Sequence, residues 1–234
     1  MLELIVPAID DCFAVSDVPD CGLPLVAGCQ AASFDDAATG KADEARAAFL
    51  AAKEADTKYL NAYISLAVLD AAQKNFDSAR QNLSAVLSAN AKNIPARMLL
   101  AELEESSGNT NGAIKQLRQV AEADDRNALA LNNLAYLLAK TDPDGALKYA
   151  ERAGEIAPKT AAIEDTLGWV YYRKGLYSYA LTHLKIAVET DGTPRRRFHL
   201  GMAYMKAGDP AMGRQIVAAA LKSDSSLATS ERDW

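Results

Sequence analysis

The side chains that most often carry enzyme chemistry are few in this chain and are poorly placed for it. The two histidines, His183 and His199, are 16 residues apart, and no carboxylate stands in register with them to make a metal site. The three cysteines lie within the first thirty residues, and their spacing matches no zinc pattern. Gly108 and Gly112 lack the strand and the Lys-Ser/Thr pair of a phosphate-binding loop. We therefore expect a protein that is not an enzyme and that binds no metal or cofactor.

One cysteine stands in a motif that could direct a modification. Residues 25–29, Leu-Val-Ala-Gly-Cys, resemble a bacterial lipobox, where a lipoprotein signal is cut and the cysteine is acylated. The basic start and the unbroken apolar stretch that normally precede the box are missing. We prefer a coincidence within a degenerate first helix, with the cytoplasm as the default location. Acylation of Cys29 in the cell envelope is the alternative.

The charge of the chain argues against nucleic acid as a partner. Its 25 Lys and Arg and 31 Asp and Glu give a net charge of −6, whereas nucleic-acid-binding proteins normally carry a basic excess. Residues 161–234 hold ten Lys and Arg and eight Asp and Glu, so an acidic partner is expected only there. No apolar run reaches the roughly 18–20 residues that span a bilayer. We expect membrane contact only if Cys29 is acylated.

Two series of small residues reveal the elements that must position these side chains. Their members recur at intervals of 33 or 34 residues. The first series is Ala67, Ala101, Ala135, Gly168 and Gly201, and the second is Ala45, Ala79, Ala113, Ala146, Ala180 and Gly213. A period of this length is typical of a solenoid whose unit is one helix pair. Two antiparallel helices approach closely only where neither carries a bulky side chain, so the period predicts an all-α solenoid of antiparallel helix pairs.

The period also divides the chain into segments. Residues 1–40 are expected to be an irregular acidic leader or a degenerate first helix, because they hold seven Asp and Glu and no Lys or Arg. Residues 41–227 are expected to form the solenoid, and residues 228–234 a C-terminal tail. The expected units are a half unit at 41–59 and full units at 60–93, 94–127, 128–160, 161–193 and 194–227.

Turn residues agree with these boundaries. Gly108, Gly175 and Gly208 follow the first helices of their units, where a left-handed cap favours glycine. Asp142-Pro143 and Asp209-Pro210 are typical of an N-cap followed by proline in the first turn. Thr160 is expected to cap the helix that begins after it.

The residues within the units resemble the tetratricopeptide-repeat family, of bacterial type. The clearest unit is 161–193, through Leu167, Gly168, Tyr171, Gly175, Tyr177, Ala180, Leu184 and Ala187. The resemblance covers about residues 45–227 and is looser in 60–127, where Asp70 and Glu104 occupy the usual aromatic position. It implies a right-handed superhelix of helix pairs.

The resemblance also implies a concave groove, lined by the first helix of each pair, in which an extended peptide or a partner helix binds. Carried over by register, the groove positions are Asn132, Asn133, Tyr136, Trp169, Tyr172, Arg173, Arg195, His199, Met202 and Lys206. In the earlier units they include Asn61, Ser65, Val68, Met98, Glu102 and Glu105. Amides can pair with a peptide backbone and cations with carboxylates, so we expect a peptide with acidic and aromatic or proline-rich segments.

Two of these assignments have an alternative, and so does the function. Trp169 and Tyr172 lie next to the packing positions Gly168 and Tyr171, so burial in the core is as good an expectation as groove exposure. The leading function is a non-enzymatic scaffold or adaptor. A second is an envelope-anchored lipoprotein that assists export or assembly. A third is a self-association module of a larger solenoid, because no polar capping helix follows the apolar face around Leu221.

Overall fold

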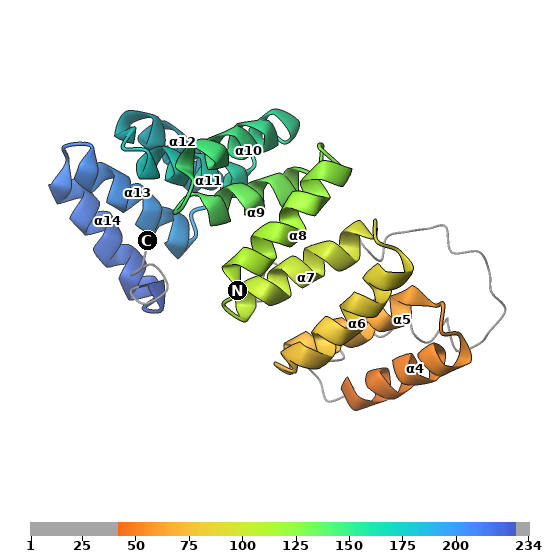
Figure 1. The fold of residues 1–234 in the computed structure, drawn as a ribbon. Helices are drawn as coiled ribbons and strands as arrows, with labels where there is room; N and C mark the ends of the chain where they lie inside the picture. The colour runs from red at the N-terminus through yellow and green to blue at the C-terminus, as the bar shows by residue number, and fades with distance from the viewer. Residues whose placement is uncertain (1–41, 228–234) are drawn as a thin grey trace. The chain divides into compact units, whose positions relative to one another are not determined.

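The structure is a computed structural model that describes residues 42–227 of the 234-residue chain. Within this range it consists of eleven α-helices and contains no strand (Figure 1). The helices are α4 (Ala42–Ala55), α5 (Leu60–Ala72), α6 (Phe76–Ala89), α7 (Ile94–Ser106), α8 (Thr110–Ala123), α9 (Ala128–Leu138), α10 (Pro143–Ile156), α11 (Ala161–Arg173), α12 (Tyr177–Thr190), α13 (Pro194–Lys206) and α14 (Pro210–Ser223). None of these helices is long and apolar enough to cross a membrane.

The helices gather into two compact units, one ending at Gln119 and the other beginning at Val120. In the first unit, α5 contacts α4, α6 and α7, and α6 contacts α7. In the second unit, the pairs α9–α10, α11–α12 and α13–α14 pack together, and α10–α11 and α12–α13 join successive pairs. Adjacent helix pairs therefore stack on one another, which confirms the predicted all-α repeat fold.

The helix ends follow from local chemistry. The Oδ1 atoms of Asp142 and Asp209 accept hydrogen bonds from the backbone N–H three residues ahead, at 2.9 and 3.0 Å. Gly108, Gly175 and Gly208 have φ angles of 81°, 76° and 104°. Both predictions are confirmed. Thr160 occupies the N-cap position of α11, as predicted, but its hydroxyl makes no capping hydrogen bond; the N–H of Ile163 donates to the backbone carbonyl of Thr160.

The small residues of the two series lie where the paired helices cross. A Cβ atom added to Gly213 would stand 2.6 Å from the carbonyl oxygen of Gly201 and 2.7 Å from the backbone nitrogen of Met205. Backbone atoms cannot move aside as a flexible side chain can. Ala79, Ala113, Ala146 and Ala180 are likewise completely buried. The mechanical role predicted for the small residues is therefore confirmed.

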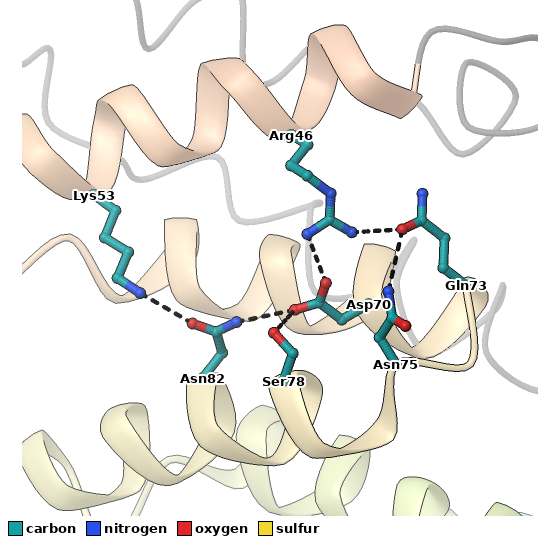
Figure 2. Close-up of polar contacts among 7 residues, drawn as sticks. All are labelled: Arg46, Lys53, Asp70, Gln73, Asn75, Ser78 and Asn82. Atoms are coloured by element: carbon teal, nitrogen blue, oxygen red, sulfur yellow. Dashed lines mark hydrogen bonds and ion pairs between the residues drawn. The ribbon is translucent and has the colours of Figure 1, made fainter.

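Ion pairs join successive helix pairs in the first unit. Arg46 of α4 donates from Nη1 to Asp70 Oδ1 of α5 at 2.6 Å (Figure 2). Arg80 of α6 donates from Nε to Glu104 Oε1 of α7 at 3.0 Å. The second pair repeats the first after 34 residues. Asp70 and Glu104 are buried, at 2% and 8% exposure. The residues that replace the family's aromatic position are therefore buried acids, each with an arginine of the preceding helix pair.

We expect Gly213→Ala to lower the free energy of unfolding by about 1–3 kcal/mol, because the added methyl group has no space. This loss outweighs the roughly 1 kcal/mol by which alanine is the better helix former. Urea unfolding followed by circular dichroism measures the change. Gly154→Ala is the control, because its Cβ would meet only methyl groups of side chains, Leu167 Cδ1 at 3.2 Å and Ile163 Cγ2 at 3.9 Å. Equal effects of the two substitutions would contradict the close-approach explanation.

We expect Arg46→Met to lower the free energy of unfolding by about 3 kcal/mol, because it leaves the buried Asp70 carboxylate without its counter-charge. The double variant Arg46→Met, Asp70→Leu should recover much of that loss. Arg152→Met is the matched control, because its ion pair with Glu155 is exposed and such pairs contribute about 0–1 kcal/mol. The same urea experiment decides, and a loss no larger than that of the control would argue against a structural role for the buried pair.

Candidate functional site

The predicted groove residues lie on three first helices of the second unit. Helix α11 contacts both α9 and α13, so these three helices stand side by side. Asn132, Asn133 and Tyr136 belong to α9, Trp169, Tyr172 and Arg173 to α11, and Arg195, His199, Met202 and Lys206 to α13. The structure separates these residues into a buried layer and a layer of half-buried or exposed residues, which we call the exposed layer.

Trp169 and His199 form the centre of the buried layer, at 1% and 0% exposure. The Trp169 ring stacks on His199 with ring centroids 4.2 Å apart, and on Tyr172 with centroids 4.8 Å apart. His199 Nδ1 lies 2.9 Å from Asp165 Oδ1, which fixes the orientation of the imidazole. Of the two alternatives for Trp169, the structure shows burial, while Tyr172 is half-buried.

The exposed layer presents cations beside aromatic rings. Arg195 places its guanidinium carbon 4.6 Å from the centroid of the Tyr136 ring and donates from Nη2 to the Tyr136 hydroxyl. This cation–π contact joins α13 to α9, two first helices that are separated by one repeat. Asn133, Arg173 and Met202 are half-buried, and Lys206 is exposed. That these residues contact a peptide stays a prediction.

Two polar atoms of the buried layer have no hydrogen-bond partner. They are Asn132 Oδ1 and Trp169 Nε1. The Asn132 side chain acts as a donor here: its Nδ2 donates a hydrogen bond to Asn133 Oδ1 at 3.3 Å, whereas its Oδ1 accepts none. A buried polar atom without a partner costs about 1–3 kcal/mol of stability. These two atoms therefore lower the stability of the buried layer.

Sequence reasoning missed the histidine–carboxylate pairs. His199 pairs with Asp165, which precedes it by one period of 34 residues, and His183 Nδ1 lies 2.7 Å from Glu164 Oε2. The one-period spacing was the available signal for the first pair, because it places two residues at equivalent positions of adjacent first helices. In the part of the chain that the structure describes, no group of three His, Cys, Asp or Glu side chains could hold a metal ion.

In the first unit, one of the predicted groove carboxylates is strongly perturbed. Glu102 lies on α7 and is half-buried. Its burial, and after that the nearby negative charge of Glu105, raise the pKa of Glu102 from 4.5 to about 7. This carboxyl group therefore titrates near neutral pH.

The stacked helix pairs, with small residues where the helices cross, define an α-helical repeat protein. The sequence model of the tetratricopeptide repeat matches residues 70–135. Residues 70–135 therefore carry the tetratricopeptide repeat that the sequence predicted. Proteins of this family are in general non-enzymatic scaffolds that bind protein or peptide partners.

Solved structures share the fold. A tetratricopeptide-repeat protein from Parabacteroides merdae is similar with a TM-score of 0.71 and 15% identity, over 85% of this chain and 78% of its own. MamA is similar with a TM-score of 0.60 and 22% identity, over 74% of this chain and 96% of its own. YrrB, described as a protein with an unusual peptide-binding site, is similar with a TM-score of 0.60 and 19% identity, over 80% of this chain and 98% of its own. No curated protein matches the chain.

We expect Glu102→Gln to stabilise the protein at about pH 8 and to change little at about pH 5. Between about pH 4.5 and 7 the folded chain binds a proton on Glu102 that the unfolded chain does not bind, so stability falls as pH rises through this window. Above the window the half-buried carboxylate is ionised, whereas glutamine stays neutral. Thermal midpoints of both proteins at the two pH values test this, with the exposed Glu122→Gln as the control. The same stabilisation at both pH values would contradict the raised pKa.

Proposed function

We propose that the exposed layer over α9, α11 and α13 binds an acidic peptide segment of a partner protein, so that the chain acts as a scaffold or adaptor. The observation that carries the proposal is the Arg195 guanidinium held over the Tyr136 ring. This contact orders a long cationic side chain before any ligand arrives, which reduces the entropy that binding has to remove. An ordered guanidinium is well suited to bind a carboxylate through two parallel hydrogen bonds.

The charges of this face favour an acidic ligand. Arg173 and Lys206 add two cations, whereas the carboxylate of Asp165 lies in the buried layer against His199. The half-buried rings of Tyr136 and Tyr172 offer contact area for aromatic or proline residues of the ligand. The fold shared with YrrB supports a peptide as the class of ligand.

The two alternatives have less support. The self-association alternative requires an open apolar face at the last helix, but Leu227 is 4% exposed and packs with Phe198 and Ala220, and Leu221 packs against this cluster. Residues of the chain itself therefore cover part of that face. Cys29 lies outside the described residues, and mass spectrometry of the protein from its native membrane fraction would test its acylation.

Selection from a library of displayed random peptides should enrich sequences with acidic and aromatic or proline residues. For an enriched peptide, we expect Arg195→Ala to weaken binding by about tenfold or more, because charged hydrogen bonds contribute about 1.5–3 kcal/mol. Fluorescence anisotropy with the labelled peptide measures the affinity. Trp169 is left unchanged in this test, because its burial would make a substitution report on folding.

The matched control for this experiment is Arg214→Ala, which removes an exposed arginine of α14. It should bind the peptide as the unchanged chain does. Equal affinities of the Arg195 and Arg214 variants would contradict the proposed binding face, and so would enrichment of basic peptides.

A further inference from the structure

A second polar site lies in the first unit, between α4, α5 and α6. A cavity of about 220 Å³ opens there, lined among others by Lys53, Tyr63, Leu66, Asp70, Ser78 and Asn82. It uses a different face of α5 from the predicted groove, whose positions on this helix are Asn61, Ser65 and Val68. Figure 2 shows the polar side chains of α4 and α6 reaching toward one another across Asp70.

The buried carboxylate of this cavity is fully compensated. Asp70 accepts hydrogen bonds from Arg46 at 2.6 Å, from the Ser78 hydroxyl at 2.6 Å and from Asn82 Nδ2 at 3.2 Å (Figure 2). The other terminal nitrogen of Arg46 donates to Gln73 Oε1 at 2.8 Å. Arg46 and Asp70 therefore neutralise each other and serve the contact between α4 and α5.

Lys53 differs from Arg46, because both of its contacts are neutral. Its Nζ atom donates to Asn82 Oδ1 at 3.2 Å and lies 4.4 Å from the centroid of the Tyr63 ring. Within residues 42–227 it makes no ion pair with a carboxylate. The Asn82 amide is itself held by its hydrogen bond to Asp70. The cavity therefore holds an ammonium group in a defined place, without a counter-charge.

We propose that this cavity binds the carboxylate of a glutamate or aspartate side chain from an acidic segment of a partner protein, with Lys53 as its ion-pair partner. The net positive charge of the cavity matches such a ligand. Its volume is below the roughly 300–1,000 Å³ of pockets that enclose drug-sized ligands, so it fits a single side chain. Leu50, at 43% exposure, and Leu66 supply apolar contact for the methylene groups of that side chain. This site is separate from the Arg195 face and does not depend on it.

The experiment is a titration of the full chain with a fluorescein-labelled peptide of alternating glycine and glutamate, followed by anisotropy at low salt. Every protein carries Arg173→Ala, Arg195→Ala and Lys206→Ala, so that the peptide cannot use the three cations of the binding face proposed in the second unit. We expect Lys53→Met to weaken binding about tenfold, because methionine keeps the apolar stem and removes the charge. The same peptide with glutamine in place of glutamate should not bind.

Two further variants separate the cavity from general surface charge. Lys185→Met is the matched control, because the Lys185 ammonium also lies over a tyrosine ring, 5.4 Å from the centroid of Tyr204, but lines no part of this cavity. It should bind as its parent does. Leu50→Glu places a carboxylate of the chain itself beside Lys53 and should weaken binding as Lys53→Met does, whereas Leu50→Gln should not. Circular dichroism shows that each variant is folded.

Three outcomes would overturn the proposal. The first is equal binding by the Lys53→Met and Lys185→Met variants. The second is binding of the glutamine peptide as tightly as the glutamate peptide. The third is an affinity that rises when the Asp and Glu residues of segment 1–40 are replaced by Asn and Gln, because the occupant would then be the chain itself. Failure of the Arg195 experiment leaves these outcomes unaffected, since all titrations lack that arginine.

Discussion

The close approach of paired helices is the constraint on which the other features of this protein depend. Where α13 and α14 cross, glycine lies against glycine, and no side chain fits between the two backbones. The same crossing position holds alanine or glycine in each helix pair from α5 to α14. A pair that packs this tightly still exposes an apolar face, which only the next pair can cover. Stacking follows, and it brings the first helices α9, α11 and α13 side by side.

The side chains that join successive helix pairs differ in chemistry between the two units. In the first unit, a buried acid on the first helix pairs with an arginine on the preceding second helix, as in Asp70 and Arg46. In the second unit, tyrosines occupy this place on α11 and α13: Tyr171 donates its hydroxyl to Glu151, and Tyr204 lies under Lys185. A buried ion pair tolerates fewer substitutions than an aromatic contact, because removal of either partner leaves a charge without compensation.

The surface chemistry of each unit follows from these contacts. The hydrogen bonds that compensate Asp70 also hold Asn82, and Asn82 in turn positions Lys53 at the wall of the cavity. In the second unit, the stack of Trp169 on His199 fills the space between α11 and α13. Tyr136 and Arg195, which contact each other across α9 and α13, are half-buried. Both proposed binding sites therefore present cations on a support of buried polar and aromatic side chains.

The sequence by itself determined the all-α class, the period, the crossing residues and most helix ends, because each depends on residues close in sequence or on strict repetition. Glycine after a helix and aspartate before proline act locally, so their signals could be read directly. Only the tertiary structure decided which of the predicted groove residues are exposed. The burial of Trp169 and His199 arises from contacts between different helices. Alignment with the repeat of a family gives the position of a residue within its helix, but it does not give the size of the side chains that pack around that residue. For the same reason, the sequence alone did not reveal Arg46 and Arg80 as the ion-pair partners of Asp70 and Glu104.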